Sequence, residues 1–350
     1  MQPSYEYQIQ FLQNIQRILK EGVFVSTYKF ALLHAIADHC IETGSDNNEE
    51  LTITTKALAA KFIDLYWMQT VKFPNESDSD VLYQNNGNQA AIINQIQQAR
   101  KVNSKLSIFK SHQEYRQLLT SVSNTIKQMP LWKLQVVSDS TVEFLYLQTA
   151  KGNVITLMPG VSYCFRKFYG QITDMVHSAW IRWIQKATNN QAMLGQNINL
   201  ESFLFESKRS NLQLFIPVLK EEQHNNCFYC DRQIRGAPEV DHFIPWARYA
   251  VDLGHNFVLS HKNCNGDKSD YLASENFLDK WVKRNLVSGD MLSSYFDDQK
   301  LTHDLSTSIS VSKWAYKQCS DNYGLVWIGH QKGFTKLSNK WTSILQSIAD

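Results

Sequence analysis

Apolar side chains recur at helical spacing through the first third of the chain. Between Phe30 and Ile41 they fall three and four positions apart, which is the period of one face of an α-helix. Stretches of polar, turn-forming residues separate this segment from the next ones. We therefore expect residues 1–128 to form a helical N-terminal region. Further helices are predicted over residues 55–68, 90–100 and 110–129.

The segment from Leu51 to Trp67 allows two interpretations. Its apolar positions suit a helix that packs against its neighbours, and they also suit one half of a DNA-binding helix-turn-helix. A packing helix explains the pattern equally well and needs no special function. We therefore favour the packing helix.

Between residues 131 and 161 the apolar period changes from that of helices to that of strands. Trp132–Val136 and Val142–Tyr146 alternate or are rich in strand-forming residues, and Val154–Leu157 follows them. Short polar turns separate the three segments, and Pro159 and Gly160 end the series. This pattern predicts a small antiparallel β meander.

A long amphipathic helix is expected next. Aromatic and aliphatic side chains recur on one face from Phe165 to Trp183, whereas charged residues such as Arg166 and Lys186 lie mostly off that face. An aromatic row of this kind can stack on nucleic-acid bases. Packing into a hydrophobic core is the simpler explanation, and we favour it.

The last part of the chain again has helical spacing, which predicts a helical C-terminal tail. The expected fold class is α+β and mostly helical. The predicted helices of this part cover residues 212–222, 273–286, 305–316 and 337–348. The expected regions are a helical N-terminal region (1–128), a β meander with the long helix (129–204), a module rich in cysteine and histidine (205–275) and a helical C-terminal region (276–350).

Composition and charge narrow the class of protein. Of the 350 residues, 43% are hydrophobic and 19% are charged, which is typical of a folded globular chain. The formal net charge is only +2, so the chain is no nucleic-acid coating protein, and any nucleic-acid contact must come from local patches. The first 20 residues lack a signal-type apolar core, and no window is apolar enough to span a membrane. We therefore expect a cytoplasmic protein with no membrane partner.

The six cysteines divide into two groups. Cys40, Cys164 and Cys319 lie in apolar surroundings, and we expect them to pack in the core. The other three cluster in one short stretch beside several histidines, which indicates metal binding rather than disulfides in a cytoplasmic chain. These three are Cys227, Cys230 and Cys264.

Two short pairs of residues form a candidate zinc site. Cys227 and Cys230 have C-x2-C spacing, and His261 and Cys264 have H-x2-C spacing. Four such ligands suit tetrahedral Zn²⁺ and leave no open position, so the role of the ion would be structural. The alternatives are two half-buried thiols beside a surface histidine, or a ligand set in which His224 or His255 replaces His261.

The segment between these pairs, together with Asn265 directly after the second pair, carries residues suited to phosphodiester hydrolysis. His242 can take a proton from water near physiological pH. Asp241 and the amide oxygen of Asn265 can bind Mg²⁺ or Mn²⁺, which would neutralise charge on the phosphate. In a regular strand, Asp241 and His242 would point to opposite faces, so both can serve one site only where the strand ends. Pro245 indicates such an end, although a buried Asp–His pair that merely supports the fold is the alternative.

These residues resemble the HNH nucleases of the ββα-metal superfamily. The resemblance rests on Asp241-His242, Asn256 and the run from Asn265 to Lys268, framed by the cysteine pairs, and it is confined to residues 227–270. It implies that His242 is the general base, that Asp241 and Asn265 hold the catalytic cation, and that Asn256 braces the loop. His261 stands where the zinc-binding subgroup has a cysteine.

Several basic residues near this segment can contact phosphates. We expect Lys268 to be the principal phosphate contact because it closely follows the start of the metal-site helix, with Arg248 and Lys262 beside it. Solvation of the surface explains most such residues equally well.

The sequence as a whole indicates an endonuclease that hydrolyses DNA, with double-stranded DNA as its partner. The resemblance suggests a role in bacterial defence or restriction. Three alternatives remain: a zinc module that binds nucleic acid without cutting it, a nuclease that acts on RNA or single strands, and an interaction protein. In the last case residues 1–200 would be the functional part and would bind a partner protein that controls cleavage.

Overall fold

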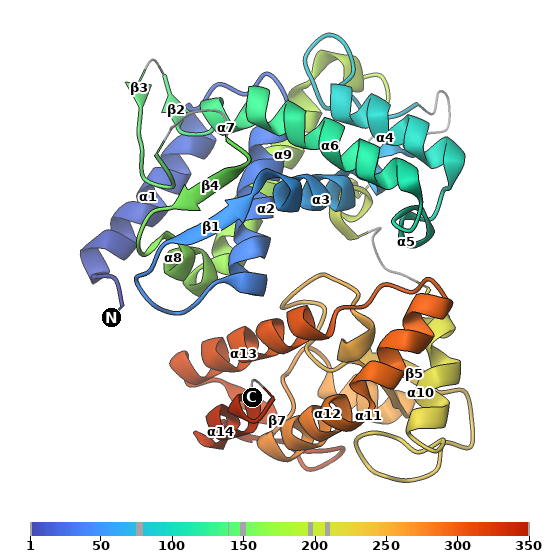
Figure 1. Cartoon of the computed structure of the whole chain (residues 1–350). Coiled ribbons are helices and arrows are strands. Elements are labelled where there is room, and N and C mark those ends of the chain that lie inside the picture. Colours follow the sequence, from blue (N-terminus) through green and yellow to red (C-terminus); the bar gives the residue numbers. More distant parts are fainter. Residues whose placement is uncertain are drawn as a thin grey trace. The chain divides into compact units, whose positions relative to one another are not determined.

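The chain folds into two compact units. The computed structural model describes residues 2–74, 80–138, 140–147, 152–194, 199–206 and 211–348. Contacts divide the chain into residues 1–207 and 208–350 (Figure 1). Helices dominate both units, and short antiparallel strand pairs accompany them, which confirms the α+β, mostly helical fold class. The finer division into four regions stays a prediction.

The first unit is built around helix α2 (Tyr28–Thr43). Nearly every residue of α2 is buried, which is typical of a helix enclosed by neighbours on all sides. The helices that pack directly on it are α3 (Thr55–Tyr66), α7 (Pro130–Lys133), α8 (Val161–Lys167) and α9 (Tyr169–Lys186). The other helices of this unit are α1 (Tyr5–Glu21), α4 (Ala91–Val102), α5 (Leu106–Phe109) and α6 (Gln113–Gln128), with short helical segments η1 (Met68–Thr70), η2 (Thr188–Asn190) and η3 (Ser202–Glu206).

The aromatic row of the long helix lies in the core, as expected. Ile172, Val176 and Trp180 of α9 are fully buried, and the Trp180 indole donates a hydrogen bond to Gln84. The chain breaks this helix in two at Phe168, between α8 and α9. Cys40, Cys164 and Cys319 are also buried, which confirms their expected place in the core.

The predicted β meander is corrected by the structure. Residues 130–133 form α7, because Pro130 suits the first turn of a helix. The strands form separate pairs: β2 (Val136–Val137) with β3 (Ser140–Thr141), and β4 (Val154–Leu157) with the distant β1 (Leu51–Thr54). Because Leu51–Thr54 is a strand, residues 51–67 are a strand followed by a packing helix, not half of a helix-turn-helix.

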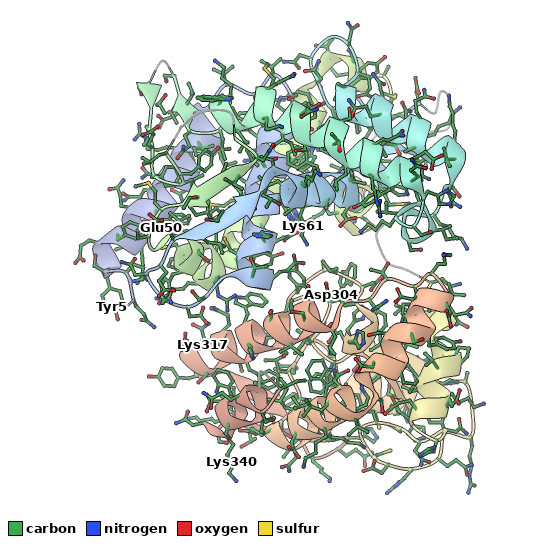
Figure 2. All side chains as sticks on the ribbon, viewed as in Figure 1. Tyr5, Glu50, Lys61, Asp304, Lys317 and Lys340 are labelled. Atoms are coloured by element: carbon green, nitrogen blue, oxygen red, sulfur yellow. The ribbon has the colours of Figure 1, made fainter. Side chains whose placement is uncertain are left out.

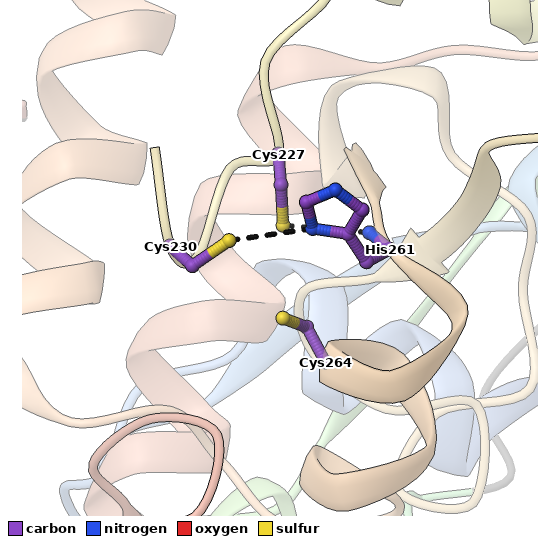
Figure 3. Close-up of side chains that lie close together, drawn as sticks. All are labelled: Cys227, Cys230, His261 and Cys264. Atoms are coloured by element: carbon purple, nitrogen blue, oxygen red, sulfur yellow. Dashed lines mark hydrogen bonds between the residues drawn. The ribbon is translucent and has the colours of Figure 1, made fainter. Parts of the chain in front are cut away.

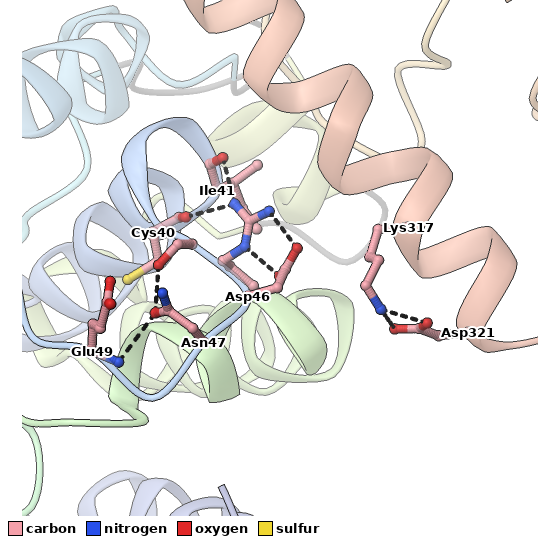
Figure 4. A network of polar contacts seen from close by, with 9 residues as sticks. Cys40, Ile41, Asp46, Asn47, Glu49, Lys317 and Asp321 are labelled. Atoms are coloured by element: carbon pink, nitrogen blue, oxygen red, sulfur yellow. Dashed lines mark hydrogen bonds and ion pairs between the residues drawn. The ribbon is translucent and has the colours of Figure 1, made fainter. Parts of the chain in front are cut away.

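Polar contacts also tie distant segments of the first unit together. Arg166 of α8 is almost fully buried, and its guanidinium donates to the carbonyls of Cys40 and Ile41 at 3.0 Å each and to Asp46 at 2.7 Å (Figure 4). These carbonyls lie in the last turn of α2, where the Cys40 carbonyl also accepts from the Gly44 nitrogen, so Arg166 adds to the cap of the helix. Lys61 of α3, which is labelled in Figure 2, pairs with Glu42 at 2.5 Å in the same unit.

The second unit contains a compact ββα element. Strand β5 (Glu239–His242) pairs antiparallel with β6 (Phe257–Ser260), and α11 (Lys262–Lys268) follows. Two elements lead into it: η4 (Leu212–Phe215) and α10 (Ile216–Glu222), while η5 (Gly254–Asn256) precedes β6. The ββα order is the one that the sequence resemblance implies.

The helical C-terminal tail is present, but a β-hairpin interrupts it. The helices are α12 (Glu275–Asp298), α13 (Leu305–Asp321) and α14 (Lys340–Gln346). Between α13 and α14, β7 (Leu325–Trp327) pairs with β8 (Phe334–Lys336), a hairpin that was not predicted from the sequence. Throughout the described part of the chain, every helix is too short or too polar to cross a bilayer.

Candidate active site

Three thiols and one imidazole meet in the second unit. Cys227 and Cys230 lie on the loop after α10, His261 immediately precedes α11 and Cys264 lies within it (Figure 3). Their ligand atoms all lie within 4.8 Å of one another. The structure therefore brings together the four side chains that the spacing singled out. A set of three cysteines and one histidine suits tetrahedral zinc.

Two polar contacts orient the His261 ring so that one of its nitrogens can bind a metal ion. Its Nε2 lies 3.4 Å from the carbonyl oxygen of Gln233, while Nδ1 lies 3.3 Å from the Cys230 sulfur. Donation from Nε2 leaves Nδ1 free to bind a cation. The competing histidine His255 is buried elsewhere, against the Gly289 carbonyl and Ser293, and His224 also lies outside the cluster.

Burial makes the Cys264 thiol difficult to ionise without a cation. It raises the pKa of the Cys264 thiol, and the neighbouring Cys227 and Cys230 sulfurs raise it further. A bound divalent ion would offset the free-energy cost of ionising the thiol, because the ion binds the thiolate form.

Asp241, His242 and Asn265 line one pocket beside this cluster. The pocket has a volume of about 780 Å³, and β5, α11 and the loop between β7 and β8 all contribute to it. β5 ends at His242, and Asp241 and His242 both contribute to the lining of this pocket although they are consecutive residues. The lining also includes Glu239, Lys262, Asp267, Asp270 and His330.

A buried carboxylate holds the candidate base. His242 Nε2 lies 2.7 Å from Asp252 Oδ1, and both side chains are almost fully buried. The imidazole packs edge-on against the rings of Phe257 and Trp246. Donation from Nε2 to Asp252 places the proton on that nitrogen, so Nδ1 is left to accept a proton from water. Sequence reasoning missed Asp252, because it lies in a loop without a recognisable motif.

Asp241 is held by two donors. Tyr229 Oη lies 2.5 Å and Lys268 Nζ 3.0 Å from its Oδ2. Burial and the adjacent carboxylate raise the pKa of Tyr229 well above its usual value, so this phenol remains a donor. Among contacts with the described residues, both fall on Oδ2, which leaves Oδ1 for a cation.

The three predicted phosphate contacts occupy different places. Lys268 has no exposed surface, and its ammonium also donates to the His242 carbonyl, so it faces the protein instead of a substrate. Arg248 is not part of the pocket lining and acts electrostatically on Tyr316 and Cys319 of α13. Lys262 is exposed and lines the pocket.

Both asparagines have defined partners. Asn265 Nδ2 donates to Glu239 at 2.9 Å, which leaves its amide oxygen for a cation. The Asn256 amide accepts from the backbone nitrogen of Ile244 at 2.8 Å and donates to the Ile244 carbonyl at 2.9 Å. Asn256 therefore braces the loop directly after His242.

The pocket is acidic, which suits a hard cation. Four of its lining residues are carboxylates: Glu239, Asp241, Asp267 and Asp270. The pKa of Asp267 is lowered, because its carboxylate accepts hydrogen bonds from the Trp327 indole and from the backbone nitrogen of Gln331. The carboxylate also lies near His330. Oxygen donors of this kind are the ligands that Mg²⁺ and Mn²⁺ prefer.

Two family models match the chain. Residues 8–202 match a family described as "Domain of unknown function (DUF8808)", and residues 227–274 match a family described as "HNH endonuclease". The second match supports a nuclease-type function and nucleic-acid binding. No significant match was found among curated proteins or among solved structures. The chain thus belongs to the family of this domain of unknown function, which covers more than half of its length, and its second unit carries an HNH endonuclease domain.

Proposed function

We propose that the chain is an endonuclease that hydrolyses DNA phosphodiester bonds in the pocket of the second unit. One observation carries this proposal. Asp241, His242 and Asn265 line a single pocket, and the buried Asp252 orients the imidazole. A module that only binds nucleic acid needs neither an oriented base nor a set of oxygen donors. The geometry therefore favours cleavage over the binding-only alternative.

The residues in and around the pocket have separate roles in the proposed hydrolysis. His242 Nδ1 takes a proton from a water molecule, which attacks the phosphorus while the ester oxygen leaves. Asp252 stabilises the imidazolium that forms, through its contact with Nε2. Tyr229 and Lys268 hold Asp241 in place, and Asn256 fixes the loop that follows the base. These residues act as positioning groups.

Asp241 and Asn265 are the residues that would hold the catalytic cation. Each has one oxygen left after its contacts with protein are satisfied. A bound Mg²⁺ or Mn²⁺ ion would neutralise charge on the phosphate and on the departing oxygen. The cluster of Cys227, Cys230, His261 and Cys264 would hold a zinc ion whose role is structural, because four protein ligands leave no position for substrate.

We propose double-stranded DNA as the substrate and, from the resemblance, a role in bacterial defence or restriction. An RNA or single-strand nuclease is the second candidate, since hydrolysis at phosphorus is common to both. Residues 8–202 are proposed to recognise the DNA or a partner protein.

The direct test is cleavage of a supercoiled plasmid with Mg²⁺ or Mn²⁺. We expect cutting that depends on the cation and falls by at least about two orders of magnitude in His242→Ala, the usual effect of losing a general base. His224→Asn is the matched control, because it removes an exposed histidine outside the pocket at a position with φ 50°, which asparagine tolerates.

Single-stranded DNA and RNA of the same sequence form the other arms of this experiment. Preferential cleavage of RNA would replace the DNA proposal. Equal cutting by the parent and His242→Ala would remove His242 from the mechanism. No cutting of any substrate without an added partner protein would favour the interaction-protein alternative.

A further inference from the structure

The β7–β8 hairpin lies outside both family matches but contributes directly to the pocket. We propose that this hairpin, residues 325–336, is a DNA-binding element whose Lys332 and Lys336 contact backbone phosphates beside the cleavage site. The inference rests on the proposed function and adds to it a binding surface. Four observations support it. The hairpin is anchored to the HNH module, and its tip lies at the pocket. Its charge is opposite to that of the pocket, and exposed residues connect the two.

The hairpin is anchored to the HNH module by its first strand. The backbone nitrogen of Trp327 donates to the Leu272 carbonyl at 2.8 Å, and the Ser274 nitrogen donates to the Trp327 carbonyl at 2.8 Å. The Trp327 ring is fully buried and packs edge-on against Tyr229, the residue that holds Asp241. The base of the hairpin is therefore part of the core behind the site.

The tip of the hairpin lies at the pocket. The Gln331 backbone nitrogen donates to Asp267 of α11 at 3.1 Å, and His330 lines the pocket. Gly329 at φ 126° and Gly333 at φ 83° allow the tight turn between them. Gln331, Lys332 and Lys336 are exposed. The turn therefore places His330 in the pocket, while Lys332 is exposed in the turn and Lys336 is exposed at the far end of β8.

The charge of this segment is opposite to that of the pocket. Residues 322–348 contain three lysines, at positions 332, 336 and 340, and no acidic residue. The pocket itself is lined by four carboxylates, which repel a phosphate backbone. A catalytic cation can offset this repulsion only locally, so flanking phosphates need cationic side chains.

Exposed residues lead from the pocket to Lys336. Asp270 lines the pocket, and the neighbouring Tyr271 packs on Phe334 of β8 with ring centroids 4.4 Å apart. Both rings remain almost half exposed. Phe334 and Lys336 lie two positions apart on one strand and therefore share a face. Lysines beside accessible aromatic rings suit contact with the phosphates and sugars of a nucleic acid.

The test measures DNA binding without cleavage. The full chain carrying His242→Ala is titrated into a fluorescein-labelled DNA duplex without divalent ions, and the dissociation constant is measured by anisotropy between about 50 and 200 mM KCl. Lys332→Ala with Lys336→Ala should weaken binding by about one order of magnitude or more and reduce the salt slope of the association constant by about two, since each phosphate contact contributes about 0.9.

Lys283→Ala with Lys300→Ala is the matched control, because it removes two exposed lysines on and just after α12. Its affinity and salt slope should equal those of the parent. The proposal is overturned if the hairpin variant also equals the parent, or if both variants weaken binding equally, which would show an effect of net charge alone. If the unmodified chain does not cut DNA and the His242→Ala chain does not bind it, the proposed function fails as well. If the unmodified chain cuts DNA but the hairpin variant binds as tightly as its His242→Ala parent, the hairpin inference alone fails.

Discussion

The contact between His242 and Asp252 decides which ring nitrogen can act as the base. An imidazole has two nitrogens, and the partner of one sets the protonation state of the other. Here a buried carboxylate 2.7 Å from Nε2 assigns the proton to that atom. Asp252 is therefore a positioning residue for the proposed hydrolysis.

Replacing Asp252 with asparagine should reduce cleavage far more than binding. The asparagine amide can donate to Nε2 and move the ring proton to Nδ1, and this exchange costs about four orders of magnitude in the serine-protease triad. We expect kcat to fall at least about tenfold while KM changes little, as measured by plasmid cleavage kinetics.

Asp252→Glu should restore part of the rate, because a carboxylate can still accept from Nε2. Asp290→Asn, at an exposed position on α12, serves as the control. A variant D252N with the parent kcat would show that Asp252 only supports the fold.

At the scale of elements, the zinc cluster joins the loop after α10 to the start of α11. The loop from Cys227 to Gly236 contains no helix or strand, and contacts such as the hydrogen bond from the Phe228 nitrogen to the Leu259 carbonyl also tie it to β6. A structural zinc site contributes its binding energy to folding. We therefore regard the cluster as the support on which the ββα element is built.

Replacing Cys227 and Cys230 with serine should remove bound zinc and destabilise the second unit by several kcal/mol, about the scale of a lost structural site. Zinc content by atomic absorption and the melting temperature of the protein test this. His242→Ala should keep one zinc ion per chain, and Cys40→Ser, at a buried cysteine outside the cluster, controls for loss of a thiol. Unchanged zinc content in the double variant would exclude the predicted ligand set.

At the scale of the whole molecule, each unit contains a histidine whose pKa is lowered by burial. Burial lowers the pKa of His39 in the first unit to about 4, and Lys61 adds to the effect. Burial lowers the pKa of His255 in the second unit to about 4 as well. In the unfolded chain both would titrate near 6.5.

Because the folded pKa lies below the unfolded value, protons bind the unfolded chain more tightly. Stability is therefore complete above pH 6.5 and is lost as the pH falls toward 4, by up to roughly 3 kcal/mol for each histidine. His255→Gln should flatten the acid part of a plot of melting temperature against pH. An identical acid slope in the parent and the variant would contradict this assignment.

Local pattern predicted many helices of this protein correctly. Residues 55–68, 90–100 and 110–129 correspond to α3, α4 and α6, because an apolar stripe and the turns that bound it are properties of neighbouring residues. Strand pairing was predicted less well. β4 pairs with β1 across about 100 residues of chain, and no local pattern identifies such a partner.

Part of the candidate site could be predicted from the sequence, and part became visible only in the folded structure. The sequence alone identified the four candidate zinc ligands and the Asp241-His242 pair, because ligand type and short spacing determine what such residues can bind. Only the tertiary structure showed that Lys268 is buried against Asp241, that Asp252 holds His242, and that the β7–β8 hairpin completes the pocket. These contacts join residues 10 to nearly 100 positions apart, and packing of the whole unit decides them rather than any local preference.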